Sequence, residues 1–207
     1  RVLFRSENIF LNRGICELLS EIAKEEHIRE PYSVVDCSTD ILDPIDMLFT
    51  EMAAGEHYLC HPFFKKLPPH TSIFIFVATD SALQVEQLPL CLRDATFISM
   101  NSDLRRVKNQ IAKRLTESTT SSCGGLEKDS RRCVKCPRLT LTKSQLYIIN
   151  AIRTGMNNQQ IAQKLGISHK TIFSHKINIM KKFQIATKQE LTRFSSVALA
   201  LSAGRIG

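Results

Sequence analysis

Residues 157–176 have the sequence NNQQIAQKLGISHKTIFSHK, and they contain the strongest pattern in the chain. Ile161 and Leu165 recur at helical spacing, which predicts one buried face of a first helix. Gly166 supplies the permissive backbone of a tight turn, and Ser168 can cap a second helix by accepting a hydrogen bond from an early amide. Two helices joined by so short a turn cross at a steep angle, which allows the second to enter the major groove of DNA.

The second helix has two different sides at about 100° per residue. The mostly apolar side holds Ser168, Ile172, His175, Ile179 and Phe183, and the opposite side holds Lys170, Phe173, Ser174, Ile177 and Lys181. We expect the first side to pack on Ile161 and Leu165, and the second to face DNA, where apolar groups suit thymine methyls and lysines suit phosphates. The predicted DNA-binding residues are Asn158, Lys170, Thr171, Phe173, Ser174, Lys176, Ile177 and Lys181. The alternative is a solvated basic helix whose two apolar residues pack on a partner protein.

The same segment resembles a known family. The matching residues are Leu141, Thr142, Gly155, Asn158, Ile161, Ala162, Leu165, Ile167, Ser168, Thr171, Ile172, His175, Lys182 and Ile185. They are similar to the signature of LuxR-type (NarL/FixJ) helix-turn-helix regulators, although Gln145 and Phe183 stand where that family usually has Glu and Leu. Within the family, residues 170–176 look most like the branch that contains RcsA, RcsB and BglJ. The resemblance implies a four-helix, all-α DNA-binding domain over residues 138–207.

The net charge is concentrated in this predicted domain. Residues 138–207 contain 11 lysines and arginines against one acidic residue, Glu190, whereas the rest of the chain has 17 basic and 19 acidic residues. A localised positive field favours a polyanion, because neutralised phosphates release counterions. Basic surfaces also bind membranes or RNA, so the charge alone does not indicate DNA. It indicates DNA because it lies on a predicted helix-turn-helix.

Length and composition set the outer limits of the prediction. A chain of 207 residues allows one large domain or two small ones. It begins with Arg1, so the native start is expected to be missing; the longest strong apolar run, residues 73–78, is far below the roughly 20 residues of a membrane span. No leader is visible, and seven cysteines without regular spacing fit reduced thiols. We therefore expect a cytoplasmic protein with no membrane contact.

The first 115 residues alternate between strand and helix patterns, which predicts an α/β architecture. The expected strands are residues 2–4, 33–37, 73–78 and 96–99, and the expected helices are residues 9–23, 44–54 and 104–115. A further short strand is possible at residues 58–60. The order resembles the receiver domain of response regulators, particularly at residues 1–4 and 9–14.

A phosphorylated receiver needs paired acids, an acceptor Asp and a Lys, and the resemblance fails at each of these positions. The acid pair falls on Ser6 and Glu7, the third strand would end at Cys60 or His61, and Ser99 or Met100 stands where the Lys belongs. Magnesium needs hard oxygen ligands, and this set lacks most of them. We predict a degenerate receiver-like domain over residues 1–115 that is not phosphorylated, and that dimerises, receives a partner or serves as a spacer.

Residues 116–137 are predicted to be a flexible linker, because they are rich in small polar residues and lack apolar periodicity. The segment contains Cys123, Cys133 and Cys136, of which the last two have metal-ligand spacing beside basic residues that would lower thiol pKa values. A structural zinc site needs four ligands, and a second pair is absent. We predict no metal and no cofactor, with incidental thiols favoured over a redox role.

The last helix is predicted to open at a capping box made by Thr187 and Glu190. Its apolar stripe includes Leu191, Phe194, Val197 and Leu201. In the LuxR-type family this helix is the dimer surface, so the resemblance implies dimerisation through these four residues. The stripe could equally be core, because a four-helix domain this small needs every apolar face.

The pattern as a whole predicts a transcription regulator and no enzyme, because no catalytic triad, phosphate-binding glycine loop or paired catalytic carboxylates is present. The branch resemblance suggests a bacterial activator of capsule, surface or virulence genes, working as a homodimer or with an RcsB-like response regulator on double-stranded DNA. Two alternatives stay open: an interaction protein that titrates another regulator, and a thiol or metal sensor using Cys133 and Cys136.

Overall fold

The structure is a computed structural model that describes residues 1–25, 33–35, 45–78, 83–120 and 136–203. The chain divides into two compact units, which are described separately. The first comprises residues 1–51, 63–80 and 94–132, and the second comprises residues 52–62, 81–93 and 133–207. Two short segments from the N-terminal half therefore belong to the unit that contains the C-terminal helices.

A five-stranded sheet is the centre of the N-terminal part. Its strands are β1 (Val2–Arg5), β2 (Val34–Val35), β3 (Met47–Met52), β4 (Ser72–Val77) and β5 (Thr96–Ser99), in the order β2-β1-β3-β4-β5. The pairs β1–β2, β1–β3 and β4–β5 are parallel. β4 is almost wholly buried, as its continuous apolar run predicts for a strand covered on both faces. The α/β fold class expected for this part is confirmed.

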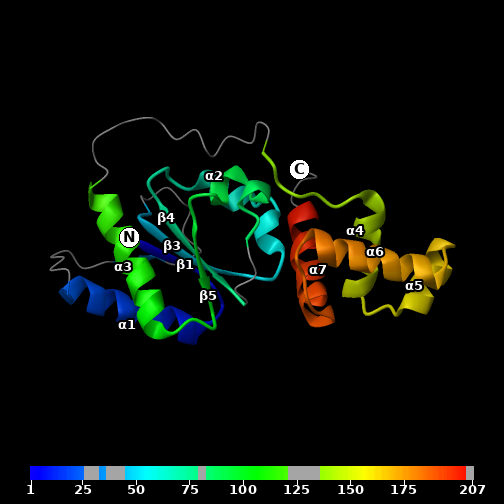
Figure 1. Ribbon diagram of the computed structural model, residues 1–207, viewed down its shortest axis with the longest axis horizontal. Helices are drawn as coiled ribbons and strands as arrows, with labels where there is room; N and C mark the ends of the chain where they lie inside the picture. The colour runs from blue at the N-terminus through cyan, green and yellow to red at the C-terminus, as the bar shows by residue number, and fades with distance from the viewer. Residues whose placement is uncertain (26–32, 36–44, 79–82, 121–135, 204–207) are drawn as a thin grey trace. The chain divides into compact units, whose positions relative to one another are not determined.

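Helices α1 (Ile9–Glu25) and α3 (Leu104–Thr120) pack together on this sheet (Figure 1). Their apolar stripes share one core cluster with sheet residues, and Ile22 and Ile111 are fully buried in it. The Lys108 ammonium on α3 binds the Glu21 and Glu25 carboxylates of α1 at 2.8 and 2.6 Å. A short helix, α2 (Pro62–Lys66), buries Phe64. α3 continues to Thr120, so the first five residues of the predicted linker are helical, and residues 121–135 lie outside the described part.

Two sequence predictions in this part are wrong. The sequence pattern predicts a helix over residues 44–54, but residues 47–52 form β3, a mostly buried strand that lies inside the sheet. Short apolar runs of this kind do not distinguish a buried strand from a buried helix. The possible strand at residues 58–60 is absent, since Glu56–Tyr58 form a 3-10 helix, η1.

The correction of β3 moves the position where a receiver would carry its acceptor. The third strand in the chain order ends at Met52, so neither Cys60 nor His61 occupies that place. Nearby, the side-chain amide of Asn8 donates to the Glu51 carboxylate at 3.3 Å. Ser99 is the last residue of β5, at the position where a phosphorylated receiver has its Lys. An acceptor Asp is missing from the end of β3 in this register as well, and the absence of phosphorylation stays a prediction.

Four helices follow the linker: α4 (Lys143–Arg153), α5 (Asn158–Leu165), α6 (His169–Lys182) and α7 (Lys188–Ala203). Each begins at a capping side chain that accepts a backbone hydrogen bond: Thr142, Asn157, Ser168 and Thr187. α4 packs along α7, and α5 packs on α6 (Figure 1). The all-α helix-turn-helix fold expected for this part is confirmed. In the part of the chain that the structure describes, no helix is long and apolar enough to cross a membrane.

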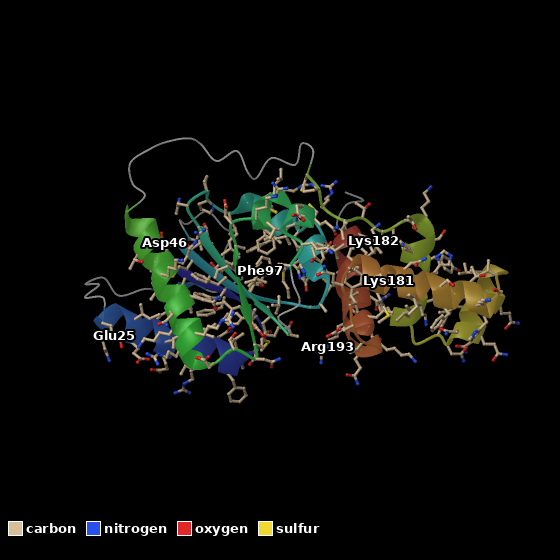
Figure 2. All side chains as sticks on the ribbon, in the orientation of Figure 1. Glu25, Asp46, Phe97, Lys181, Lys182 and Arg193 are labelled. Atoms are coloured by element: carbon tan, nitrogen blue, oxygen red, sulfur yellow. The ribbon has the colours of Figure 1, made fainter. Side chains whose placement is uncertain are left out.

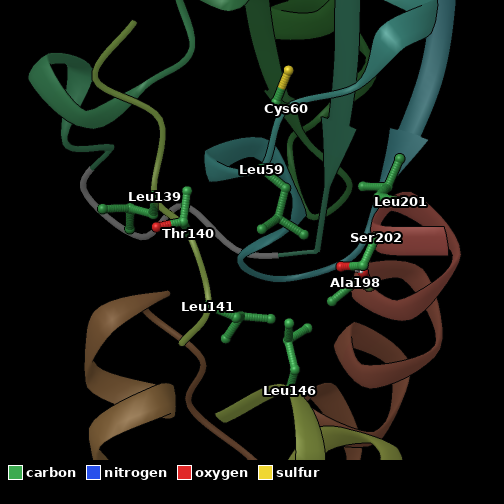
Figure 3. A pocket seen from close by; sticks show the side chains of 9 residues that line it. All are labelled: Leu59, Cys60, Leu139, Thr140, Leu141, Leu146, Ala198, Leu201 and Ser202. Carbon is green, nitrogen blue, oxygen red and sulfur yellow. Dashed lines mark hydrogen bonds between the residues drawn. The ribbon is translucent and has the colours of Figure 1, made fainter. Parts of the chain in front are cut away.

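A cavity of about 200 Å³ lies inside the second unit (Figure 3). Leu59 and Cys60 form one wall, and residues 139–141 and α7 form the others. The backbone N–H of Leu139 donates to the Tyr58 carbonyl at 3.0 Å beside this cavity. The segment that precedes α4 is therefore bound to residues 52–62 by a backbone hydrogen bond as well as by apolar side chains.

Candidate nucleic-acid interface

The turn between α5 and α6 has the geometry that the sequence predicts. Gly166 lies in the left-handed region at φ 63°, where a side chain would be strained, and Ile167 N–H donates to the Ala162 carbonyl at 3.2 Å. Ser168 Oγ then accepts from Thr171 N–H at 3.0 Å and starts α6. Three residues therefore end one helix and begin the next, which fixes the crossing of the pair.

One face of α6 is buried in the helical core. Ile172, Ile179 and Phe183 have no exposed surface, and neither has Ile161 on α5. The Phe183 ring packs on Phe194 of α7 with centroids 4.7 Å apart. Burying an aliphatic or aromatic side chain contributes about 1.5–3 kcal/mol, so this face anchors α6 firmly. α5 packs on α6 and Ile161 is fully buried, in agreement with the prediction, whereas Leu165 is half-buried.

The opposite face of α6 is open. Lys170, Thr171, Ser174 and Lys181 are exposed, Ile177 is half-buried, and the large apolar side chain of Phe173 is 55% exposed. An aromatic ring in this position has no role in the domain core. The hydroxyls are partly engaged within the helix, since Ser174 Oγ donates to the Lys170 carbonyl at 3.1 Å. Figure 2 shows Lys181 with Lys182 at the C-terminal end of α6.

Two of the predicted DNA-binding residues bind each other. The Lys176 ammonium on α6 donates a hydrogen bond to the Asn158 side-chain oxygen on α5. Burial lowers the pKa of Lys176, and the charge of Lys188 on α7 lowers it further. Lys176 is therefore positioned by the first helix of the pair rather than extended freely into solvent.

The predicted dimer residues on α7 divide into two groups. Leu191 and Phe194 are buried in the core at 3% and 0% exposure, whereas Val197 and Leu201 are half-buried. Leu201 also lines the cavity of Figure 3. The dimerisation assignment stays a prediction, and it now depends chiefly on Val197 and Leu201.

The residues that follow α6 are held by the 52–62 segment of the same unit. The buried Tyr58 hydroxyl donates to Gln184 Oε1 at 2.6 Å and accepts from Gln84 N–H at 3.1 Å. Burial raises the pKa of Tyr58. Gln184 has φ 54°, a left-handed conformation that non-glycine residues adopt at a cost. A Cβ on Gly55 would lie 2.8 Å from the Phe183 carbonyl oxygen, so only glycine allows this approach.

Sequence reasoning missed several of these features. The Asn157–Gln160 capping box has a local signal, a cap residue three positions before Gln, and it could have been found. The Lys176–Asn158 bond and the Tyr58–Gln184 bond have no local signal, because each depends on how separate segments pack.

No metal was predicted, and among the described residues no group of three His, Cys, Asp or Glu side chains is placed to hold one. Cys123 and Cys133 lie outside the described residues.

Comparison with known proteins agrees with the helix-turn-helix geometry. Residues 139–195 match the model of the family described as bacterial regulatory proteins, luxR family. The oxygen regulatory protein NreC of Staphylococcus epidermidis is 30% identical over 114 residues, which cover 53% of this chain and 47% of that protein. NreC of Staphylococcus aureus is 39% identical over 59 residues, or 28% of this chain and 27% of the relative. The chain matches about half, or less, of the length of these relatives.

Solved structures of similar fold extend over most of the chain. A structure of the two-component response regulator RcsB bound to DNA covers 95% of this chain and 97% of that chain, with a TM-score of 0.51 and 18% identity. At this identity the likeness concerns the fold: a receiver-like α/β part followed by a helical part. The family match and the geometry of α5 and α6 identify residues 139–195 as a helix-turn-helix domain of the luxR family of bacterial regulatory proteins.

Proposed function

We propose that the protein is a sequence-specific DNA-binding transcription regulator. The observation that carries the proposal is the open face of α6, where Lys170, Phe173 and Lys181 are exposed next to a fully buried opposite face. Lysines at this position neutralise phosphates, and an exposed ring suits thymine methyls in the major groove. The excess of basic residues in residues 138–207 supports the same partner. Asn158, Thr171, Ser174, Lys176 and Ile177 complete the proposed contact set.

We infer that the regulator works as a dimer in the cytoplasm, as a homodimer or with an RcsB-like response regulator, and reads two half-sites. Val197 and Leu201, half-buried on α7, are the residues available for pairing. The likeness of residues 170–176 to the RcsA and BglJ branch favours an activator of capsule or other surface genes. Since a phosphorylation site is not expected, its abundance or its partner would set its activity.

The central experiment selects binding sites from a library of random-sequence DNA duplexes with the full chain, alone and with an RcsB-like regulator. We expect one enriched motif, in two half-sites if the protein binds as a dimer. Size-exclusion chromatography with light scattering then gives the mass of the protein and of the mixture. A library that stays random in both cases would contradict sequence-specific binding.

Charge reversal separates the proposal from its rival, in which the protein titrates another regulator without touching DNA. The double variant Lys170→Glu with Lys181→Glu should lower affinity for the selected duplex by at least about tenfold and reduce the salt dependence of binding by about two phosphate contacts. The matched control, Lys143→Glu with Arg193→Glu, makes the same charge change at exposed positions on α4 and α7. Equal losses in both variants would indicate non-specific attraction. Unchanged regulation of target genes by the first variant would favour titration.

A further inference from the structure

Two thiols that are distant in sequence come to neighbouring positions in the second unit. The backbone N–H of Leu90 donates a hydrogen bond to Cys136 Sγ at 3.4 Å. Cys91 is the next residue after Leu90, in the 3-10 helix η3 (Leu90–Leu92). Both Cys91 and Cys136 are thiols with partly exposed side chains, whereas Cys60 is buried.

The contact with Leu90 places the Cys136 sulfur one residue along the chain from Cys91. Consecutive Cα atoms are about 3.8 Å apart, so the Cys136 sulfur, which is 3.4 Å from the Leu90 nitrogen, lies at most about 9 Å from the Cys91 Cα. Disulfides join residues whose Cα atoms are roughly 4.4–6.8 Å apart, so the bond requires η3 and residue 136 to bring the two sulfur atoms together. We propose that Cys91 and Cys136 form a reversible disulfide. This pairing differs from the Cys133–Cys136 pair that the spacing in sequence suggests.

The oxidant we name is hydrogen peroxide, and the reaction balances with it alone. One thiol, as thiolate, attacks a peroxide oxygen and breaks the O–O bond, giving a sulfenic acid and, with the thiol proton, one water. The second thiolate attacks that sulfur and displaces its hydroxyl, which leaves as a second water when it takes up the second thiol proton. The two sulfur atoms together lose two electrons, and the peroxide gains them.

The disulfide would add a covalent bond to residues 136–142, which are already held by a hydrogen bond. Residues 136–142 lead into α4, and Leu139 N–H donates to the Tyr58 carbonyl at 3.0 Å. Residues 83–93 bind the same tyrosine through Gln84 N–H, at 3.1 Å from the Tyr58 hydroxyl. A Cys91–Cys136 bond would join these two segments covalently and close the loop between them. Oxidation would then reduce the freedom of the chain that enters the helical domain.

The test treats the full chain with hydrogen peroxide, blocks remaining thiols with an alkylating reagent, and digests it without reductant for mass spectrometry. We expect a cross-linked peptide that joins Cys91 to Cys136 and disappears on reduction. It should persist in Cys133→Ser and Cys60→Ser and be lost in Cys91→Ser and Cys136→Ser. The mapping of the unsubstituted chain decides the question even if a variant folds poorly.

A second readout does not depend on substitutions. The oxidised chain should unfold at a temperature higher than the reduced chain by about 5 °C or more, because the bond constrains the unfolded state. A dominant Cys133–Cys136 bond, or oxidation of Cys91 and Cys136 to sulfinic acids without cross-linking, would overturn the proposal. None of these measurements involves DNA, so they are independent of the proposed function.

Discussion

The Lys176 ammonium on the second helix of the helix-turn-helix is bonded to the Asn158 side chain on the first. This bond ties together the two helices whose relative orientation determines how a duplex is met. The Lys176 side chain is partly buried, and this burial lowers its pKa. Lys176 therefore has a structural role in addition to any contact with phosphate.

The first prediction separates these two roles of Lys176. Lys176→Met removes the charge, whereas Asn158→Ala keeps the charge and removes its acceptor. Each single change should lower the free energy of unfolding by about 1 kcal/mol, and the double variant should cost less than the sum, since the two residues share one bond. Urea unfolding measures this coupling. In DNA binding, only Lys176→Met should reduce the slope of log affinity against log salt concentration, by about one phosphate contact. If both variants kept the slope of the unsubstituted chain, Lys176 would act only in folding.

Neighbouring residues on α6 give a second prediction with its own control. Phe173 is 55% exposed, and Ile172 beside it has no exposed surface. Phe173→Ala should change the free energy of unfolding by no more than about 0.5 kcal/mol yet weaken binding to the selected duplex several-fold. Ile172→Ala should cost about 3 kcal/mol of stability through loss of core packing. Fluorescence anisotropy and urea unfolding measure the two effects, and wild-type affinity in Phe173→Ala would remove the ring from the interface.

Three glycines allow a graded test of the contact between Gly55 and Phe183. Gly55 and Gly155 both have positive φ, of 80° and 77°, but only at Gly55 would a Cβ meet other atoms, at 2.8 Å. Gly14 is in helix α1 with open space around it. Gly155→Ala should cost about 1 kcal/mol for strain alone, Gly55→Ala about 2 kcal/mol or more, and Gly14→Ala should stabilise by up to about 1 kcal/mol. Thermal unfolding measures the order of stability of the three variants. Similar losses of stability for Gly55→Ala and Gly155→Ala would argue against a close contact between Gly55 and Phe183.

A pH dependence follows from the buried His57. Burial lowers the pKa of His57 to about 4 from its ordinary value of 6.5. The unfolded chain therefore takes up a proton below pH 6.5 that the folded chain resists until about pH 4. The contribution of His57 to the free energy of unfolding should be fully present above pH 6.5. It should fall progressively toward pH 4, by about 3 kcal/mol at most.

The control for this pH dependence is His70, whose side chain is 58% exposed. Urea unfolding at several pH values should give a flatter profile for His57→Gln, while His70→Gln keeps the slope of the unsubstituted chain. If His57→Gln retained the full slope, another group would have to carry it.

Much of the helical domain could be predicted because its determinants are local. Thr142, Gly166, Ser168 and Glu190 act within three or four residues of themselves, and the apolar spacing of α6 places Ile172 and Ile179 in the core. The missed features are tertiary. β3 lies between β1 and β4, and nothing in residues 47–52 shows that arrangement. The left-handed Gln184 is likewise supported by Tyr58, which is 126 residues away.

The approach of Gly55 to Phe183 has a consequence for chimaeric regulators. Phe183 presents its ring to the helical core and its backbone oxygen to Gly55, so one residue serves two partners at once. A graft of residues 138–207 onto a foreign N-terminal half would lose the contact between Gly55 and that oxygen unless residues 52–62 are transferred as well. The segment to transfer is therefore discontinuous in sequence. A fusion point in the linker would separate residues 52–62 from the helices that they contact.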